Sequence, residues 1–297
     1  PENFLFPFME GVIANLKTLG KIRTSETYAA TLCSFRRFRE DKDVTLDDMD
    51  SDMMMAYEAY LKNNGVSPNS SSFYMRNLRA VYNRAVEKGL TSQRFPFKHV
   101  YTGVEKTVKR AVPLKVIKKI KEMDFSMNPS FDFARDMFLM SFYTRGMSFV
   151  DMAYLRKKDL QNGVLSYRRR KTGQQLFIKW EKCMQEIVDK YDTSQSNYLL
   201  PIIKPFGDID ERKQYIYAAH NINRCLKIIG KELGLSVSLT LYVARHAWAS
   251  IAKSKNVPLS VISEGMGHDS EATTRIYLAS LDTMAIDKAN SMILKSL

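Results

Sequence analysis

Three residues near the C-terminal end of the chain have side chains that together can act on a phosphate ester. Arg245 supplies a guanidinium, His268 an imidazole and Tyr277 a phenol, in that order. A phenol has a solution pKa of about 10, so it needs cations that stabilise the phenolate and the pentacoordinate phosphorus. A guanidinium can donate two parallel hydrogen bonds to phosphate oxygens, and an imidazole can donate to the phosphate or take the proton of the phenol. Such a set can break and rejoin a phosphodiester without a metal.

The order and spacing of these residues match a known pattern. Tyr277 lies nine residues after His268 (277 − 268), and both follow an Arg-His pair. The three segments are Tyr242-Val243-Ala244-Arg245-His246, Gly265-Met266-Gly267-His268 and Thr273-Thr274-Arg275-Ile276-Tyr277. In these motifs the chain resembles the tyrosine recombinases, also called phage-type integrases. The resemblance covers most of the chain, and the C-terminal third carries the motifs.

The resemblance implies an enzyme that transfers DNA strands, a site-specific recombinase or integrase of a mobile element. Tyr277 would form a 3′-phosphotyrosyl bond and release a 5′-hydroxyl, with no metal or other cofactor. The partner would be double-stranded DNA, on which a monomer or weak oligomer assembles into a homotetramer. Two alternatives remain open: a type IB topoisomerase, which uses similar chemistry without exchanging partners, and a DNA-binding accessory factor with a decayed active site.

A run of basic residues supplies a further catalytic candidate. Arg168, Arg169, Arg170 and Lys171 precede Thr172-Gly173, where the family places a lysine on a β-hairpin. An ammonium there would protonate the departing 5′-oxygen and so avoid a strongly basic leaving group. The alternative is that all four residues grip the DNA backbone without a catalytic role. We assign Lys171 to the catalytic set, and Arg168 and Arg170 to DNA binding.

Two positions depart from the family pattern. Tyr242 stands three residues before Arg245, where the family usually has histidine. A phenol can still donate a hydrogen bond to a phosphate oxygen, but it carries no charge near neutral pH. Ser148 stands three residues before Asp151, at the place of the first arginine of the family. These departures are the main support for a decayed site.

Two arginines are candidates to replace the missing first arginine. Arg145 lies one helical turn before Ser148, so the two residues would share a face. Arg169 lies two residues before Lys171, so in a strand both side chains would point to the same side. We favour Arg145, because Ser148 is small enough to let its side chain pass, and keep Arg169 as the rival. Asp151 is expected to orient the second family arginine or a main-chain turn of the active site.

The composition indicates a polyanionic partner. The 297 residues include 45 Lys and Arg against 32 Asp and Glu, a net charge of +13. Residues 1–105 carry 14 basic and 13 acidic side chains, which leaves 31 and 19 for residues 106–297, so the C-terminal part is expected to be the main phosphate binder. The three cysteines show no metal-ligand spacing, and no segment is apolar enough to span a bilayer. We expect a cytoplasmic, nucleoid-associated protein with no metal site and no membrane contact.

The chain is expected to be mainly α-helical and to form two domains that clamp duplex DNA. Residues 1–100 are interpreted as a four-helix, SAM-like core-binding domain, and residues 101–112 as a basic linker along the DNA. Residues 113–297 would form a mostly helical catalytic domain with a small antiparallel sheet. Asn162-Gly163 and Thr172-Gly173 are the turn signals of that sheet.

In the first domain we expect helices over Thr27–Arg39 and Met53–Leu61, and a long helix that begins at Ser67-Pro68 and ends at Gly89. The arginines that their apolar faces leave outside would form a duplex-gripping surface. These are Arg36, Arg37, Arg39, Arg76, Arg79 and Arg84, joined by Lys109 of the linker.

The two ends of the chain carry their own expectations. The tail after Tyr277 is apolar at Met284, Ile286, Met292, Ile293 and Leu297. In the family the last helix docks on a neighbouring protomer, and the alternative is docking on its own domain. The chain begins at Pro1 and not at a methionine, and the resemblance leaves room for an additional small DNA-binding domain before it.

Overall fold

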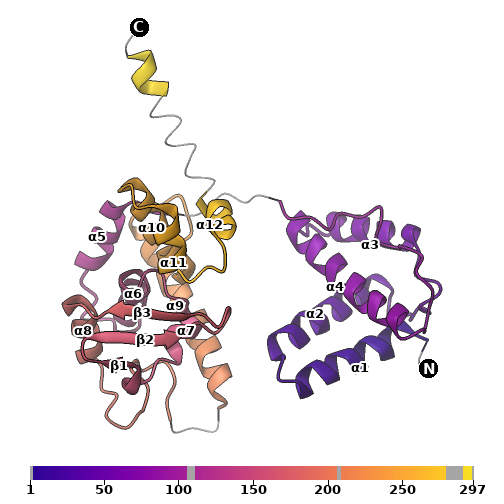
Figure 1. Ribbon diagram of the computed structural model, residues 1–297, viewed down its shortest axis with the longest axis horizontal. Coiled ribbons are helices and arrows are strands. Elements are labelled where there is room, and N and C mark those ends of the chain that lie inside the picture. The colour runs from indigo at the N-terminus through magenta and orange to yellow at the C-terminus, as the bar shows by residue number, and fades with distance from the viewer. Residues whose placement is uncertain (1–2, 106–110, 206–208, 279–289, 296–297) are drawn as a thin grey trace. The chain divides into compact units, whose positions relative to one another are not determined.

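The computed structural model describes residues 3–105, 111–205, 209–278 and 290–295, without the side chains of residues 276 and 277. The chain divides into two compact units, Pro1–Thr107 and Val108–Leu297 (Figure 1). The division falls within the expected linker, of which residues 106–110, including Lys109, lie outside the described residues. Each unit has a hydrophobic core of its own.

The described part of the N-terminal unit contains four helices, as expected. They are α1 (Leu5–Thr18), α2 (Ile22–Phe38), α3 (Ser51–Asn63) and α4 (Pro68–Glu87). Each helix contributes fully buried side chains to one core, among them Leu5, Phe35, Tyr57, Leu78 and Tyr82. Burial of these apolar and aromatic groups stabilises the bundle.

The ends of α4 lie where the sequence signals placed them. The Ser67 hydroxyl accepts a hydrogen bond from the Ser70 N–H, and Pro68 occupies the first turn. Gly89 follows the helix with a φ of +71°, a conformation that glycine adopts without strain. The prediction for this helix is confirmed.

The two preceding helices begin earlier than expected. α2 begins at Ile22 and not at Thr27, because its first turn already packs: Ser25 is fully buried and its hydroxyl donates to the Ile22 carbonyl. In α3 the capping residue is Asp50, whose carboxylate accepts a hydrogen bond from the Met53 N–H at 2.8 Å. Both starts predicted from the sequence are therefore too late, for α2 because its first turn packs in the core and for α3 because Asp50 caps the helix.

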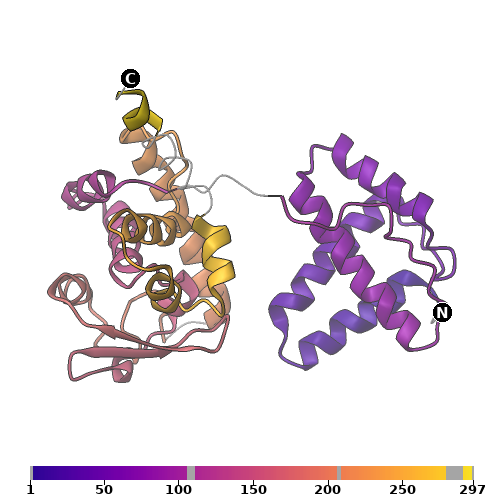
Figure 2. The same cartoon turned by 45° about the horizontal axis from the view of Figure 1, so that its top comes forward.

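The C-terminal unit is mostly helical with one small sheet. Its elements are α5 (Leu114–Glu122), α6 (Pro129–Tyr143), α7 (Phe149–Ala153), the 3₁₀ turn η1 (Lys157–Asp159), β1 (Leu160–Gln161), β2 (Val164–Arg168), β3 (Gln175–Lys179), α8 (Lys182–Asp189), α9 (Glu211–Glu232), α10 (Leu241–Ser254), α11 (Leu259–Gly265) and α12 (Glu271–Leu278). Residues 290–294 are also helical. Figure 2 shows the sheet along one side of the helices.

The sheet is antiparallel in the order β1-β2-β3. Asn162 and Gly163 join β1 to β2 with φ angles of +50° and +73°, the left-handed pair that a two-residue hairpin turn requires. The second hairpin differs. The last pair is Arg168 with Gln175, so residues 169–174 form a six-residue loop in which Gly173 has a φ of +74°.

Helix α6 is the centre of the C-terminal core. α9 and α10 pack against it, which explains why its residues are apolar on several faces. A smaller cluster joins the end of α10 to α11 and α12, and its buried members are Ala249, Ala252, Ile262, Met266 and Leu278. This cluster fixes the backbone of α12 against the helix that carries Arg245.

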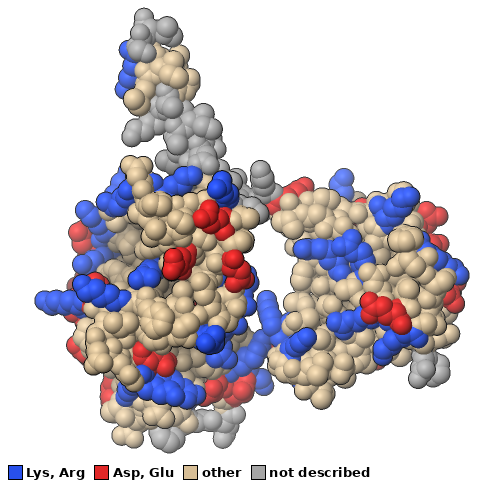
Figure 3. All heavy atoms as spheres, in the orientation of Figure 1, with Lys and Arg blue, Asp and Glu red and all other residues tan. Residues whose placement is uncertain are grey.

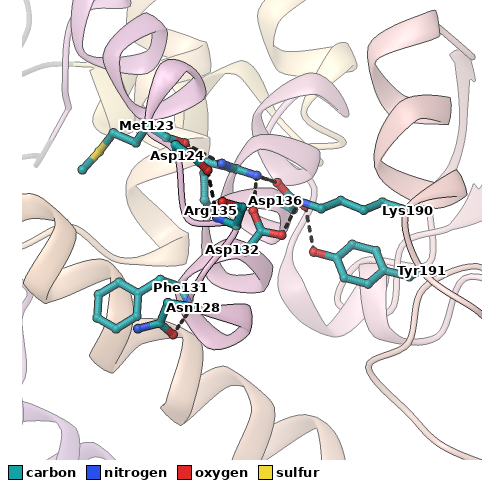
Figure 4. A network of polar contacts seen from close by, with 10 residues as sticks. Met123, Asp124, Asn128, Phe131, Asp132, Arg135, Asp136, Lys190 and Tyr191 are labelled. Carbon is teal, nitrogen blue, oxygen red and sulfur yellow. Dashed lines mark hydrogen bonds and ion pairs between the residues drawn. The ribbon is translucent and has the colours of Figure 1, made fainter.

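A network of charged groups ties α6 to the segment after α8 (Figure 4). Arg135 contacts the carboxylates of Asp132 and Asp136, and Lys190 contacts the same two carboxylates. The Tyr191 hydroxyl donates to Asp136 at 2.7 Å. Asp136 is 3% exposed, and a carboxylate is buried this deeply only when cations and hydrogen bonds compensate its charge.

Lys and Arg side chains are spread over the visible face of each unit and do not gather in a single patch (Figure 3). Asp and Glu lie among them. In the part of the chain that the structure describes, no helix is long and apolar enough to cross a membrane.

Candidate active site

Arg245 lies in α10 with its guanidinium buried. The residue is 6% exposed. Its Nη1 donates to the carbonyl of Gly146 and its Nη2 to the carbonyl of Met266, both at 2.7 Å. Main-chain carbonyls from the turn after α6 and from the end of α11 therefore set the orientation of this guanidinium.

The turn after α6 approaches α10 very closely. Arg145 and Gly146 both have positive φ angles, +62° and +73°. A Cβ added at Gly146 would lie 2.6 Å from the Cα of Arg245, nearer than any side chain allows. Only glycine fits this position, and the close approach brings the Gly146 carbonyl within reach of the Arg245 guanidinium.

His268 follows α11 and contacts Arg245. Its Nε2 lies 3.0 Å from Nη2 of Arg245, and its Nδ1 lies 2.7 Å from the hydroxyl of Thr274 in α12. A guanidinium can only donate, so Nε2 accepts and Nδ1 carries the proton, which it donates to Thr274. The imidazole is thereby fixed in one tautomer.

His268 is neutral at physiological pH. Burial, followed by the positive charges of Arg245, Arg169 and Lys171, lowers its pKa from the ordinary 6.5 to about 4. Of the three cations that lower this pKa, Arg245 lies in α10, and Arg169 and Lys171 lie in the loop between β2 and β3. The same burial and cations disfavour protonation, so the imidazole keeps the lone pair of Nε2 but is a weak base unless an anion offsets those cations.

The loop between β2 and β3 brings two basic side chains to this place. Arg169 is 7% exposed and donates to the carbonyl of Gly267, next to His268. Lys171 is exposed. Neither residue belongs to a strand, yet Arg169 continues the alternation of β2 and points to the buried side, as Tyr167 does.

Asp151 holds this loop in position. Its carboxylate accepts hydrogen bonds from the Arg170 N–H at 2.9 Å and from the Ser148 hydroxyl at 2.6 Å. The Arg170 guanidinium lies 3.9 Å above the ring of Tyr154. Asp151 thus contacts a main-chain turn beside Lys171, and Arg170 contacts the end of α7.

Arg245, His268, Arg169 and Lys171 line one cavity of about 480 Å³. Its walls come from the turn after α6, the β2–β3 loop, α9, α10 and the α11–α12 connection. The lining residues are Gly146, Met147, Ser148, Phe149, Arg169, Lys171, Thr172, Ala219, Asn223, Leu241, Tyr242, Arg245, His268, Asp269 and Thr273. The cavity therefore joins two arginines, a lysine and a neutral histidine, groups that suit an anionic phosphate.

Family models match both units of the chain. The Phage integrase SAM-like domain matches residues 4–100, and the Phage integrase family matches residues 114–284. The chain belongs to the phage integrase family, the tyrosine recombinases. Membership places it among the DNA recombinases. No curated protein matches its sequence.

The fold of the recombinase is similar to solved structures of low sequence identity. A lambda integrase dimer bound to a COC′ core site has a TM-score of 0.70 at 16% identity, covering 92% of this chain and 77% of that chain. A lambda integrase tetramer bound to a Holliday junction gives 0.66 at 17%, with 90% and 75% covered. The XerH recombinase bound to a palindromic difH substrate, a post-cleavage complex, gives 0.69 at 17%, with 95% and 83% covered. At these identities the likeness shows the fold.

One expected catalytic residue, Arg145, and the expected supporting carboxylate, Asp151, do not line the cavity. Arg145, favoured from the sequence as the first arginine, lies in the turn after α6 with its Cδ beside Gly265. Asp151 lies behind the loop and contacts its main chain. Tyr242 lines the cavity, is 60% exposed and stacks edge-on against His246 at 4.5 Å.

Tyr277 belongs to α12, but its side chain lies outside the described residues. The neighbouring residues of the helix are well placed: Thr274 is fully buried and bonded to His268, and Leu278 is 1% exposed in the α10–α11–α12 cluster. The backbone that carries Tyr277 thus adjoins the cavity wall.

The arginines expected to form one DNA-gripping surface lie on α2 and α4 or at the end of α2, and several contact neighbouring groups of the N-terminal unit. Arg36 pairs with Glu10 of α1 at 2.5 Å, and Arg84 lies 5.7 Å from the ring of Tyr28 in α2. Arg76 and Arg79 of α4 are exposed. Other residues predicted to bind DNA donate hydrogen bonds to neighbouring groups. Arg37 donates to the Cys33 sulfur, Arg79 to the Thr102 hydroxyl, and Arg168 of the hairpin to the Gly173 carbonyl.

Asn223 and Ala219 of α9 line the cavity and were not expected from the sequence. Neither belongs to a motif. Their position depends on the packing of α9 against α10, a contact between segments that only the fold brings together.

Proposed function

We propose that the recombinase cuts and rejoins duplex DNA at specific sites through a covalent bond between Tyr277 and a 3′-phosphate. The phenolic oxygen of Tyr277 would form a bond to phosphorus, and the bond from phosphorus to the 5′-oxygen would break. The proton of the phenol would pass to a base, and a second proton would pass to the departing 5′-oxygen. Reversal with a different 5′-hydroxyl joins new partners.

The observation that carries this proposal is the cationic cavity beside α12. Arg245 and Arg169 would hold the non-bridging oxygens of the phosphate, because a guanidinium keeps its charge and can donate two parallel bonds. His268 is neutral beside these cations, and it would take the proton of Tyr277 once the negative charge of the phosphate offsets them. Lys171, exposed on the hairpin loop, would protonate the 5′-oxygen.

Arg169 is proposed in place of the first family arginine. Arg169 lines the cavity and contributes to the depressed pKa of His268. Arg145 does neither, although sequence spacing favoured it. Ser148, which occupies the family position, turns its hydroxyl to Asp151 and caps α7. Asp151 would act by holding the Lys171 loop.

The proposed substrate is double-stranded DNA, bound by a homotetramer that assembles on it. Support comes from family membership and from the relatives bound to DNA, one of them a tetramer on a Holliday junction. The net charge of +13 suits a polyanion. Integration or excision of a mobile element, by a protein associated with the nucleoid, is the proposed setting.

A binding factor with a decayed active site is the second candidate. The exposed phenol of Tyr242 and the Ser148 hydroxyl, which is hydrogen-bonded to Asp151, favour this candidate, since neither supplies a cation to the phosphate. The cavity formed around Arg245, His268 and Arg169 favours the enzyme. A type IB topoisomerase would use the same cavity, and strand passage by a monomer would distinguish it.

The test uses nicked duplexes of randomised sequence, in which cleavage releases a short fragment and prevents rejoining. We expect protein–DNA adducts that resist SDS with the wild type, and none with Tyr277→Phe, which should bind the same DNA. Salt-sensitive binding without any adduct would support the decayed factor. Adducts that persist in Tyr277→Phe would overturn the choice of nucleophile.

A further inference from the structure

Asn223 occupies a position in the cavity that the proposed chemistry has not used. It lies on α9, one helical turn after Ala219, and both residues line the cavity that holds Arg245, His268 and Lys171. Asn223 is half-buried. An amide at this place presents one acceptor and two donor hydrogens to its surroundings.

A contact with α10 distinguishes the oxygen of the Asn223 amide from its nitrogen. The Oδ1 atom of Asn223 accepts a hydrogen bond from the Leu241 N–H at 2.9 Å. This N–H belongs to the first turn of α10, where Thr240 is the N-cap residue but makes no side-chain hydrogen bond to the helix. Asn223 thus caps α10 from a neighbouring helix. Because Oδ1 faces the helix end, Nδ2 carries the free donors, and no acceptor for Nδ2 occurs among the residues that the structure describes.

A hydrogen-bond donor at this place would add to the groups of the cavity that can bind the phosphate. Tyr242 and Ser148 line the same cavity, and neither is a basic residue. The Ser148 hydroxyl donates to Asp151, so it does not serve the phosphate in this arrangement. A donor held in place before the substrate arrives stabilises developing charge without reorganising.

We propose that Asn223 is a catalytic residue whose Nδ2 donates a hydrogen bond to a non-bridging oxygen of the scissile phosphate, while its Oδ1 caps α10. The assignment rests on the proposed strand cleavage and adds a residue to it. One side chain then links the position of α10, which carries Arg245, to the binding of the reacting group.

Two variants separate the donor from the cap. Asn223→Asp keeps an oxygen for the Leu241 N–H but has no donor, whereas Asn223→Ala loses both. We expect the melting temperature of Asn223→Asp to stay near that of the wild type, and that of Asn223→Ala to fall by roughly 3 °C. Ala219→Asp is the control for charge, because it adds a carboxylate one turn away and keeps Asn223.

The decisive readout is single-turnover cleavage of nicked duplexes with either an ordinary scissile phosphate or one sulfur in place of a non-bridging oxygen, as separate diastereomers. Sulfur is a weak acceptor. On the ordinary phosphate we expect Asn223→Ala and Asn223→Asp to cleave about 10²-fold more slowly than the wild type, and Asn223→Asp to lose more than Ala219→Asp.

On one diastereomer the loss in Asn223→Ala should shrink to about threefold or less, because the wild type has already lost that hydrogen bond. The same loss on all three substrates, or no loss at all, would overturn the proposal and leave Asn223 a helix cap. A wild type that forms no adduct on the ordinary phosphate would count against the proposed function instead.

Discussion

Arg245 and Arg169 are held by main-chain carbonyls. Arg245 donates to Gly146 and Met266, and Arg169 donates to Gly267. Because these acceptors carry no full charge, the guanidinium groups keep their positive charge available for a phosphate. At the scale of single residues, the site is therefore prepared for an anion.

The two candidate first arginines can be separated by cleavage rates. We expect Arg169→Ala to cleave about 10²- to 10³-fold more slowly than the wild type, because one guanidinium no longer reaches the phosphate. Arg145→Ala should stay within about tenfold, and Arg169→Lys should recover part of the rate because it keeps the charge. Single-turnover cleavage, with DNA binding as a control, checks this. A near-normal rate in Arg169→Ala together with an inactive Arg145→Ala would reverse the assignment.

His268 should make stability depend on pH. Its pKa is about 4 in the folded protein and about 6.5 when unfolded, so protonation favours the unfolded chain. The stability is fully present above pH 6.5 and is lost as the pH falls toward 4. Since the side chain is partly exposed, we expect a loss of only roughly 1–2 kcal/mol.

Denaturant unfolding of the wild type and of His268→Gln between pH 7 and 4 measures this loss. The carboxylates titrate in both proteins, so the difference between the two curves isolates His268. We expect His268→Gln to lose less stability on acidification. Parallel curves would mean that the imidazole is not held neutral.

At the scale of elements, short turns position the cavity. Gly146 lets the turn after α6 pack directly on α10, and Asn223 caps α10 from α9. The hairpin loop is fixed from below by the Asp151 carboxylate. A change at Gly146 or Asp151 is therefore expected to move a cavity wall without replacing any side chain that is proposed to touch the phosphate.

Replacement of Gly146 tests this dependence on a single turn. In Gly146→Ala the new Cβ would meet the α10 backbone at 2.6 Å in a left-handed conformation, so we expect a loss of about 3 kcal/mol or more. Gly163→Ala is the matched control, because Gly163 also has a φ of +73° but nothing within 4 Å. It should lose only about 1 kcal/mol. Equal losses in thermal or denaturant unfolding would show that the close approach does not matter.

Local signals in the sequence predicted those helix ends and turns that depend only on neighbouring residues. Ser67-Pro68 and Gly89 bound α4, and Asn162-Gly163 forms a two-residue turn, because each effect acts within a few residues. The start of α2 was missed, since it depends on the burial of Ser25 in the core.

The sequence predicted residues of the candidate site only where those residues belong to motifs. The motifs identified Arg245 and His268, and the basic run before Thr172-Gly173 identified Arg169 and Lys171, although both lie in the β2–β3 loop and not in a strand. Preference between Arg169 and Arg145 required the position of the turn after α6, and Asn223 required the packing of α9 on α10. Contacts between distant segments leave no mark in a single sequence.

At the scale of the whole molecule, charge is divided unequally between the units. Residues 106–297 carry a net charge of +12 and residues 1–105 a net charge of +1 (31 − 19 and 14 − 13). Two arginines of the N-terminal unit also contact acidic or aromatic neighbours, Arg36 with Glu10 and Arg84 with the ring of Tyr28. The C-terminal unit is therefore expected to supply most of the electrostatic binding to DNA.

The salt dependence of DNA binding measures this division. We expect the fragment 108–297 to keep most of the slope of log affinity against log salt that the full chain shows, because released counterions follow the phosphates neutralised. The fragment 1–107 should show a shallow slope. A steeper slope for the fragment 1–107 would place the main electrostatic contacts in the N-terminal unit.

The most direct test of the central claim is the chemical identity of the covalent adduct. After cleavage of a nicked duplex, proteolysis and mass spectrometry would locate the nucleotide on a peptide of the protein, and end-labelling would identify the released DNA end. We predict a 3′-phosphate esterified to Tyr277 and a free 5′-hydroxyl. A nucleotide attached to another residue, or through a 5′-phosphate, would contradict the account.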